Sequence, residues 1–489
     1  MRSANPVDSS LALLTDLYEL TMAYGYWKLG RSAQQAAFHL FFRTAPFQGA
    51  YAVAAGLEAA LDFLAEFRFR EDDLAYLAAL RGNDGQPLFA REFLDELARF
   101  RFACDVDAVP EGTIVFGHEP LIRVCGPILQ AQLAETALLN IVNFQTLIAT
   151  KAARVVRAAD GDPVIEFGLR RAQGVDGGLS ASRAAYVGGC AGTSNVLAGK
   201  RYGIPVLGTH AHSWVMAFDD ELEAFQAYAR AMPNNCVFLV DTYDTLEGVR
   251  RAVQVGRQLR DAGHELAGIR LDSGDLAALS VAARQILDAG GFPRAAIVGS
   301  SDLDEQAIAE LKQRGAAISV WGVGARLATA YDQPALGGVY KLGAVREKDG
   351  PWTPKLKLSA QAAKSTLPGV LQVRRFADDH GFTADLIYDA LAGIDPRWTC
   401  VDLADAQRRG RLSPDASQCD LLRPVLRDGR PLPEAREPLD AIRARVREQL
   451  ARFPESVVRL AAPEPYRVGL DAGLHERREA LARRLRGAP

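Results

Sequence analysis

The hydrophobic positions in the first part of the chain follow two rhythms. In residues 8–30 and 72–101 they recur every three or four positions, which predicts helices with one apolar face. In residues 36–43 they alternate weakly, which favours a strand, and in residues 104–130 short β-like runs are broken by proline and glycine. The N-terminal part therefore reads as an α+β region that contains a small antiparallel sheet.

From about residue 131 the rhythm changes to a repeated unit. A short apolar run is followed by a turn rich in glycine or serine and then, in several cases, by a helical stretch. Such alternation predicts parallel strands joined by right-handed crossovers. The expected fold is α/β, an irregular (β/α) barrel over residues 131–345, with an open doubly wound sheet as the alternative. The apolar runs lie at 163–168, 185–190, 204–212, 236–242, 266–275, 295–302, 317–324 and 338–345.

The remaining residues, 346–489, are more polar and richer in proline. Residues 355–369 read as a loop, and residues 434–489 read as a helix rich in arginine and glutamate. We interpret the charges of this last stretch as a solvated helix face.

Composition narrows the class of protein. The net charge of −3 provides no global basic field, so neither nucleic acid nor a membrane surface is an expected partner. No apolar run is long enough to span a bilayer and the N-terminus lacks a signal-peptide pattern, so a cytoplasmic location is expected. The six cysteines form no CxxC pair, which argues against a zinc knuckle or a disulfide scaffold.

Polar residues follow almost every one of the apolar runs. In an α/β barrel these positions, the carboxyl ends of the strands, collect the active site. The turns GTSN (192–195), SGD (273–275), GSSD (299–302) and GVG (322–324) could cradle phosphate through backbone N–H groups, although serine and aspartate cap ordinary helices equally well. Asp272 could bind a ribose hydroxyl or Mg²⁺.

Two of the seven histidines, His210 and His212, lie two residues apart at the end of one apolar run. Such a pair could bind a metal ion together, act as an acid/base pair, or consist of one catalytic histidine beside one that has no catalytic role. Metal-dependent amidohydrolases also place HxH at a strand end, but they need further ligands on later strands. The later histidines lie in a turn (His264) and in the C-terminal tail (His380 and His475). The set of metal ligands that an amidohydrolase needs is therefore incomplete.

Several segments in the same order along the chain together resemble the nicotinate phosphoribosyltransferase family. No single one would be specific, but the set is. The segments are LLTDLYELTMAYGYW (13–27), EFGLRRAQGVDGGLSASR (166–183), GTSNVLAGKRYGIPVLGTHAHSWV (192–215), RLDSGDL (270–276), SSDLDE (300–305), WGVGARL (321–327), PALGGVYKL (334–342) and STLPG (365–369).

The resemblance implies a barrel with a second α+β domain, assembled from residues 1–130 and 346–489. It implies that nicotinate and 5-phosphoribosyl-1-pyrophosphate (PRPP) are joined to give nicotinate mononucleotide and pyrophosphate, the first step of NAD salvage from nicotinic acid. ATP is the implied co-substrate, with Mg²⁺ held mainly by substrate phosphates. Family members usually act as dimers, so we expect a homodimer in which the helix at 8–30 reaches the partner's active site.

The resemblance also implies roles for single residues. His212 would take the γ-phosphate of ATP, which leaves His210 as the bystander. Tyr18, lent by the partner subunit, and Phe167 would sandwich the pyridine ring. Thr209 would bind the nicotinate carboxylate together with an arginine, for which Arg170, Arg171 and Arg270 are the candidates.

The implied contacts to PRPP come from the strand-end turns and from the STLPG segment. Asp272 and the SGD turn would bind the ribose hydroxyls. At position 301 the family commonly has asparagine, so serine there is a departure that puts the role of this residue in doubt. The implied ribose- and phosphate-binding residues are Ser194, Asn195, Ser273, Gly274, Ser300, Ser301, Gly322, Val323, Gly324 and Thr366.

Two alternatives stay within this resemblance. The first is the relative that uses nicotinamide, although the forms GTHAHS and FGLRRAQG favour nicotinate. The second is a catalytically silent paralogue that acts as a binding or regulatory protein. The presence of Arg170, His212 and Asp272 disfavours this second reading.

Overall fold

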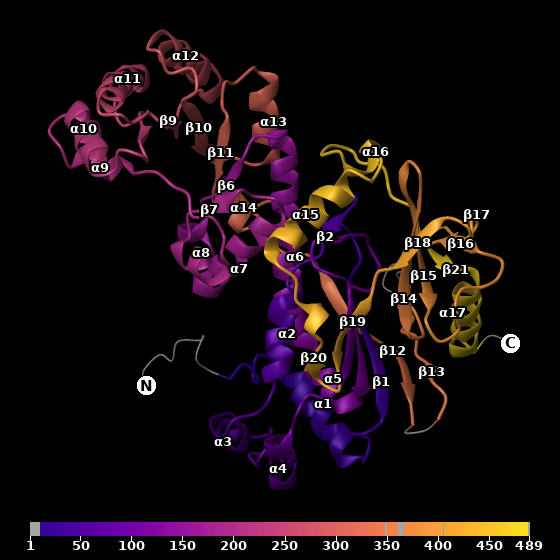
Figure 1. Ribbon diagram of the computed structural model, residues 1–489. Coiled ribbons are helices and arrows are strands. Elements are labelled where there is room, and N and C mark those ends of the chain that lie inside the picture. The colour runs from indigo at the N-terminus through magenta and orange to yellow at the C-terminus, as the bar shows by residue number, and fades with distance from the viewer. Residues whose placement is uncertain (1–9, 348–349, 360–365, 404, 488–489) are drawn as a thin grey trace. The chain divides into compact units, whose positions relative to one another are not determined.

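The chain folds into two compact units, one of which is assembled from both ends of the sequence. The computed structural model describes residues 10–347, 350–359, 366–403 and 405–487. One unit comprises residues 1–147 and 335–489, and the other comprises residues 148–334. The boundary falls inside the long helix α6, Glu135–Ala159 (Figure 1).

A six-stranded parallel sheet forms the centre of the unit of residues 148–334. Its order is β7-β6-β11-β10-β9-β8, so the first strand, β6, lies beside the last, β11. Ile269, Ile297 and Trp321 are fully buried within these strands, as expected for parallel strands that are covered on both faces. The strands are β6 (Val164–Glu166), β7 (Gly192–Thr193), β8 (Val237–Leu239), β9 (Gly268–Leu271), β10 (Ala296–Ser301) and β11 (Val320–Val323).

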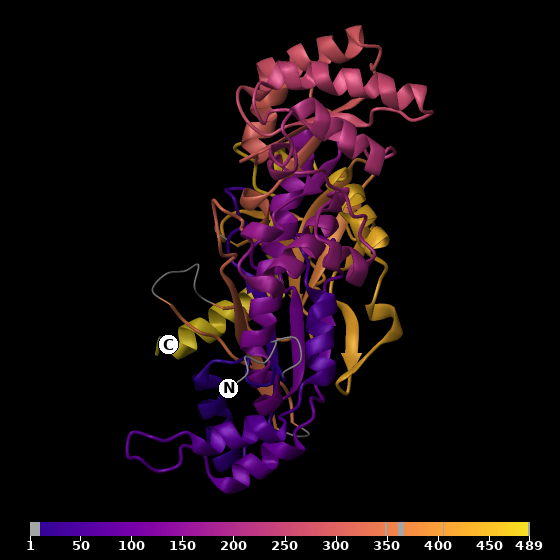
Figure 2. The same cartoon turned by 90° about the vertical axis from the view of Figure 1, so that its left-hand side faces the viewer.

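Helices connect these strands and cover the sheet. Helices α9 to α13 pack next to one another in chain order. Most of this group is seen in pink in Figure 1 and, turned by 90°, in Figure 2. The helices of the unit are the short η1 (Leu169–Arg171), α7 (Gly174–Val187), α8 (Val196–Tyr202), α9 (His212–Met216), α10 (Glu221–Ala231), α11 (Thr245–Asp261), α12 (Leu276–Ala289), α13 (Glu305–Gln313) and α14 (Ala325–Ala328).

The strand pairings confirm the α/β class and the parallel sheet, but they do not close a barrel. Among the described residues the sheet ends at β8 on one side and, on the other, at β7 with Val206 bridged to Thr193. Three expected strands of this sheet are wrong. Residues 204–212 form no strand and contribute only the bridge from Val206 to Thr193. Residues 185–190 lie at the end of α7, because the alanine-rich run before them continues as helix. Residues 338–345 belong to an antiparallel sheet of the other unit.

That antiparallel sheet has seven strands and holds the predicted strand at 36–43. The order is β13-β12-β1-β5-β3-β19-β20. Pairing between β3 and β5 confirms the small antiparallel sheet expected within residues 104–130. The strands are β1 (Gln35–Phe42), β3 (Asp105–Ala108), β5 (Ile122–Pro127), β12 (Gly338–Arg346), β13 (Thr353–Pro354), β19 (Arg423–Arg427) and β20 (Arg430–Pro431), and β2 (Ala52–Val53) pairs separately with β4 (Ile114–Val115).

A second sheet lies in the C-terminal part, mostly within residues 371–420, for which the sequence predicted no strands. Its order is β17-β16-β21-β15-β14-β18, and its core includes Phe376, Leu386 and Leu412. The single helix expected over residues 434–489 is wrong, because α15 (Leu439–Leu450) and α17 (Ala472–Leu485) are separated by α16 (Glu455–Val458) and β21. The strands are β14 (Leu371–Asp378), β15 (Gly381–Asp389), β16 (Thr399–Asp402), β17 (Arg409–Arg411), β18 (Ser417–Asp420) and β21 (Val468–Asp471).

The helices of this unit also refine the expected boundaries. The stretch 72–101 is two helices, because a turn containing Gly82 and Gly85 interrupts it. Residues 8 and 9 of the expected N-terminal helix, and residues 360–365 of the expected loop, lie outside the described residues. The helices are α1 (Leu17–Lys28), α2 (Leu57–Glu66), α3 (Glu71–Ala79), α4 (Arg91–Arg99), α5 (Ile128–Leu133), η3 (Pro433–Ala435), α15 (Leu439–Leu450), α16 (Glu455–Val458) and α17 (Ala472–Leu485).

Within the described part of the chain, no helix combines the length and the apolar character that crossing a bilayer requires.

Candidate active site

A pocket lies at the carboxyl ends of β6, β9, β10 and β11, where the sequence predicted the functional rim. Its volume is about 220 Å³. Because parallel strands end at one edge, turns far apart in the sequence meet there. The lining residues are Phe167, Arg170, Arg171, Arg270, Asp272, Ser300, Ser301, Asp302, Gly322, Gly324 and Ala325.

Arg270 holds together the polar side chains of this pocket. Its Nε donates to Ser300 Oγ at 2.8 Å, Nη1 to Thr209 Oγ1 at 3.1 Å, and Nη2 to Asp272 Oδ1 at 2.7 Å. The guanidinium carbon lies 5.6 Å from the centre of the Phe167 ring. Every nitrogen of the guanidinium therefore has a protein partner, so Arg270 acts here as a fixed organiser of its neighbours.

Asp272 is a half-buried carboxylate held in its charged form. Burial by itself would raise its pKa, but hydrogen bonds from Ser300 and Arg270, together with the charge of Arg270, bring the pKa of Asp272 below its ordinary value. A carboxylate with a lowered pKa stays ionised through the neutral range. Asp272 therefore presents a fixed negative charge to the pocket.

The two histidines of the GTHAHS segment occupy different environments. His210 is 8% exposed; its Nε2 accepts the Leu239 N–H at 3.3 Å and its ring centre lies 5.0 Å from that of Tyr228. Burial lowers the pKa of His210. The His212 side chain is 40% exposed at the start of α9, with Nδ1 3.1 Å from Thr242 Oγ1. His210 is thus a buried, packed side chain, and His212 is the accessible one.

Asp241, which the sequence reading did not single out, lies beside His212. Its carboxylate is 1% exposed, and Oδ2 accepts the Asp272 N–H at 3.0 Å and the Ser273 hydroxyl at 2.5 Å. Its Oδ1 lies 4.0 Å from His212 Nε2 and has no hydrogen-bond partner among the described atoms. Asp272 Oδ2 lies 3.9 Å from the same nitrogen, so two carboxylates face one imidazole.

Phe167 and Gly322 depend on each other. A Cβ at position 322 would lie 2.6 Å from Cε2 of the Phe167 ring, closer than atoms can approach. Glycine at 322 therefore creates the space in which the ring lies. The side chain of the neighbouring Val323 is fully buried, so only its backbone could contact a ligand.

Other residues of the predicted set in this unit lie outside the lining of the pocket and have local structural contacts. Asn195 is buried and caps α8, with Oδ1 accepting the Ala198 N–H at 3.2 Å, while Ser194 is half-buried after β7. Gly274 has φ of 80°, a conformation that suits glycine in the turn between Ser273 and the helix cap Asp275. These placements shape the rim, but they do not bring the Asn195 side chain into the pocket lining.

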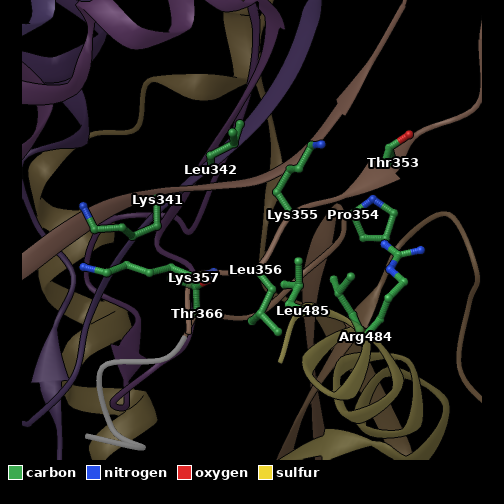
Figure 3. Close-up of a pocket in the computed structure, with 11 residues that line it drawn as sticks. Lys341, Leu342, Thr353, Pro354, Lys355, Leu356, Lys357, Thr366, Arg484 and Leu485 are labelled. Carbon is green, nitrogen blue, oxygen red and sulfur yellow. Dashed lines mark hydrogen bonds between the residues drawn. The ribbon is translucent and has the colours of Figure 1, made fainter. Parts of the chain in front are cut away.

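Tyr18 and Thr366 belong to the other unit. Tyr18 is 48% exposed on α1, and Thr366 Oγ1 accepts the Lys357 N–H at 2.9 Å. Thr366 lines a cavity of about 350 Å³ whose charged lining residues are all basic among those described. We refer to it as the cationic cavity; its basic residues, drawn in Figure 3, are Lys341, Lys355, Lys357 and Arg484.

The described residues contain no group of three or more His, Cys, Asp or Glu side chains that could hold a metal ion. The carboxylates of Asp241 and Asp272 could supply at most part of a coordination sphere. A magnesium ion at this rim would thus need oxygen ligands from a bound phosphate.

Comparison with known proteins assigns the chain to a family. Models of the nicotinate phosphoribosyltransferase N-terminal domain, the family itself and the C-terminal domain match residues 13–143, 163–349 and 372–478. A nicotinate phosphoribosyltransferase of Bacillus subtilis is 49% identical over 78% of this chain and 77% of its own length. One from Mycobacterium tuberculosis is 42% identical over 91% of this chain and 88% of its own.

The fold agrees with this assignment. The crystal structure of human nicotinic acid phosphoribosyltransferase superimposes with a TM-score of 0.83 at 34% sequence identity, covering 96% of this chain and all of the human one. Together, the family models, the relatives and the fold show that this chain belongs to the nicotinate phosphoribosyltransferase family.

Proposed function

We propose that this protein transfers the phosphoribosyl group of PRPP to nicotinate, forming nicotinate mononucleotide for NAD salvage, and that ATP hydrolysis is coupled to this step through phosphorylation of His212. The observation that carries the proposal is the meeting of an aromatic ring, Phe167, with Arg170, Arg270 and Asp272 at the pocket. A flat anionic base and a polyphosphate sugar need such a combination of apolar face, fixed cations and an ionised carboxylate.

The glycosyl transfer itself requires little proton transfer. The pyridine nitrogen forms a bond to C1 of the ribose while the bond from C1 to the pyrophosphate oxygen breaks, and pyrophosphate leaves with the electron pair. The transition state carries positive charge on the sugar, so the protein must position the reactants and stabilise charge. Asp272, held ionised by Arg270 and Ser300, would bind the ribose hydroxyls and offset that charge.

Arg170 is the arginine that we assign to the nicotinate carboxylate. All three nitrogens of Arg270 already donate to protein groups, whereas Arg170 is an exposed side chain that lines the pocket beside Phe167. A free guanidinium can bind a carboxylate through two parallel hydrogen bonds. Such a site disfavours nicotinamide, whose amide leaves the cation without its counter-charge.

Arg170→Gln is expected to raise the KM for nicotinate by about ten- to a hundredfold, the usual loss for a hydrogen bond between charged groups. Discrimination against nicotinamide should fall by a similar factor. Steady-state kinetics with both bases measures the two effects. Arg171→Gln is the matched control, since Arg171 lines the same pocket; an effect on nicotinate that is larger for Arg171→Gln would move the assignment to that residue.

His212 is the proposed phosphoryl acceptor because it is the accessible imidazole of the pair. A ring nitrogen would form a bond to the γ-phosphorus of ATP while the bond to the β–γ bridging oxygen breaks and ADP leaves. The carboxylates of Asp241 and Asp272 lie 4.0 and 3.9 Å from His212 Nε2, where they would stabilise the positive charge that develops on the imidazole as the new N–P bond forms. A phosphoryl group on His212 would then lie at the same rim as Asp272, where it can alter the affinity for PRPP.

Asp241→Asn is expected to lower kcat about tenfold in the presence of ATP while leaving the KM for nicotinate within a factor of two. The substitution removes the negative charge that faces His212 Nε2, and it keeps the side-chain shape near Ser273 and the Asp272 N–H. Rates measured with and without ATP separate a role of Asp241 in the ATP-dependent step from a role in the fold of the rim. An equal loss without ATP would show that Asp241 only supports the fold of the rim.

Mg²⁺ is the proposed cofactor. The ion neutralises charge on the phosphates of ATP and of the leaving pyrophosphate. Since the described residues offer only the carboxylates of Asp241 and Asp272 near His212, most ligands would be phosphate oxygens and water.

A homodimer is proposed because the unit that carries Tyr18 presents partial features of a substrate site. Tyr18 and Leu17, in the first turn of α1, and Leu14, which precedes the helix, are exposed apolar or aromatic side chains. The cationic cavity with Thr366 has the charge that the phosphates of PRPP need. We propose that a partner subunit supplies the Tyr18 ring opposite Phe167.

The experiment that tests the activity offers both bases at once. Purified protein is incubated with PRPP, MgATP and equal concentrations of nicotinate and nicotinamide. The mononucleotides are then separated by chromatography and identified and quantified by mass spectrometry. Nicotinate mononucleotide is expected as the dominant product. Dominant nicotinamide mononucleotide, or neither product, would refute the proposed substrate.

A further inference from the structure

The turns that follow β10 and β11 are linked to each other at two places. Within the sheet, the last paired residues of the two strands are Ser301 and Val323. Three residues further along each segment, Arg326 Nη1 donates to Asp304 Oδ2 at 2.8 Å. The two turns are therefore enclosed by strand pairing at one end and by an ion pair at the other.

Residues that line the pocket lie between these two links. The turn after β10 contributes Ser301 and Asp302 to the lining, and the turn after β11 contributes Gly324 and Ala325. Neither member of the ion pair is among the described lining residues. The pair can thus influence a ligand in the pocket through the separation of the two turns, without contacting the ligand.

Asp304 divides its carboxylate between two helix starts. It is the N-cap of α13, where its Oδ1 accepts the Ala307 N–H at 2.9 Å, and its Oδ2 accepts from Arg326 on α14. The Asp304 side chain is 14% exposed and that of Arg326 is 37% exposed. A partly buried ion pair is screened less by solvent and salt than one on the surface, so this pair can hold the two helix starts together.

The backbone of Ser301 indicates that the turn after β10 is constrained. Its φ is 153°, and residues other than glycine seldom adopt a positive φ. An uncommon backbone conformation costs free energy and persists only where the surrounding contacts determine it. The strand pairing before this turn and the ion pair after it are such contacts. Without the ion pair, the turn should relax away from the conformation that lines the pocket.

We propose that Asp304 and Arg326 are positioning residues that hold the two turns at the separation required by the 5-phosphate of the ribose. The inference rests on the proposed function in taking this phosphate as the ligand of the two turns. Groups that bind a ligand must be held close to the productive geometry by residues that support them. Loss of the pair should therefore weaken binding of the phosphate and leave the contacts to the pyridine ring intact.

The test compares two ligands that differ only in this phosphate, nicotinate mononucleotide and nicotinate riboside. Titration calorimetry on the full-length protein gives both affinities, and the affinity for the mononucleotide divided by that for the riboside reports the contribution of the phosphate. We expect Asp304→Asn to lower this ratio about fivefold, within the usual range of pairwise couplings. Asparagine caps a helix about as well as aspartate, so the variant keeps the cap of α13 and loses only the charge that faces Arg326.

Arg326→Gln removes the same pair from the other side and should lower the ratio equally. Combining the two substitutions should lower it by no more than about 1.5-fold further, because the residues act as one pair. Arg326→Lys should restore most of the ratio, since a single nitrogen of Arg326 makes the bond to Asp304. The arginine variants also keep the test decisive if Asp304→Asn fails to fold.

Asp244→Asn is the matched control. Asp244 follows β8 of the same sheet and caps α11, with its Oδ1 accepting the Glu247 N–H at 2.9 Å. The substitution removes the charge of a capping aspartate that belongs to neither of the two turns. The ratio of affinities should stay within about 1.5-fold of wild type, because asparagine keeps the cap.

The inference is overturned if Asp304→Asn and Arg326→Gln leave the ratio unchanged, or if their effects multiply in the double variant. A far larger loss in Arg326→Gln than in Asp304→Asn would also overturn it, because Arg326 would then bind the phosphate itself. The titrations need no turnover. A protein that shows the expected ratios but forms no nicotinate mononucleotide would refute the proposed function and keep the inference, and a protein that forms it while the ratios stay unchanged would do the reverse.

Discussion

Replacing His212 by alanine is expected to abolish the stimulation of nicotinate turnover by ATP. The His212 side chain is 40% exposed at the rim and faces the carboxylates of Asp241 and Asp272, and we propose that it accepts the phosphoryl group. A coupling between two ligand sites is typically worth about 5- to 150-fold. With ATP present, the turnover rate of the variant should therefore be lower than that of wild type by a factor in this range. Without ATP, the two rates should be equal.

His210→Gln is the control for this prediction. His210 is buried against Tyr228 and accepts a backbone N–H from Leu239. Its substitution should lower the melting temperature but keep the ratio of rates with and without ATP. Loss of that ratio in His210→Gln, with His212→Ala still stimulated, would exchange the roles of the two histidines.

The second large effect is expected for Asp272→Asn, which should lower kcat about 10²- to 10³-fold, as for other groups that stabilise transition-state charge. Hydrogen bonds from Ser300 and Arg270 hold the pKa of Asp272 below its ordinary value. Because a lowered pKa keeps the carboxylate ionised as pH falls, wild-type activity should be insensitive to this group down to the ordinary range of an aspartate. Steady-state rates of wild type and Asp272→Asn, measured between about pH 5 and 8, where proteins are usually most stable, check the loss of kcat and the absence of a pH effect from this carboxylate.

Asp275→Asn is the matched control, only three residues away. Asp275 caps α12 by accepting the N–H groups of Ala277 and Ala278, and it pairs with Arg314. Because asparagine caps a helix about as well as aspartate, the substitution should leave the melting temperature nearly unchanged and kcat within about threefold. A comparable loss of kcat in both variants would indicate that Asp272, too, acts through the fold of the turn.

The rim of this site could be predicted because it depends on local rules. Apolar runs alternating with helices indicate parallel strands, and parallel strands end at one edge. Phe167, Arg270, Asp272 and Ser300 follow from that logic together with the family motifs, and the structure brings them around one pocket. The sequence left the choice among the arginines open, and our proposal of Arg170 depends on the contacts of Arg270, which only the fold shows.

Other features depend on contacts between distant segments. Asp241 is one of many aspartates at strand ends, and only the fold shows its buried carboxylate facing His212. The cationic cavity joins β12, the segment after β13 and α17, which no local pattern connects. Leu17 reads as a core position of its helix but is 54% exposed, while Glu19 is buried, because Thr15 and Thr136 satisfy its carboxylate.

The strand misassignments have similar causes. The run at 185–190 is apolar and short, a pattern that a buried helix end shares with a buried strand. The strand β21 lies within a stretch dominated by arginine and glutamate, and it forms because β15 and β16 pair with it on either side. At β21, tertiary pairing overrides local preference.

The most direct measurement of the central claim is nicotinate mononucleotide formation from PRPP, with and without MgATP, in wild type and in His212→Ala. The account predicts nicotinate turnover that ATP stimulates in wild type and does not stimulate in the variant. Equal stimulation in both would contradict the phosphohistidine, and an absence of nicotinate turnover in wild type would contradict the proposed activity itself.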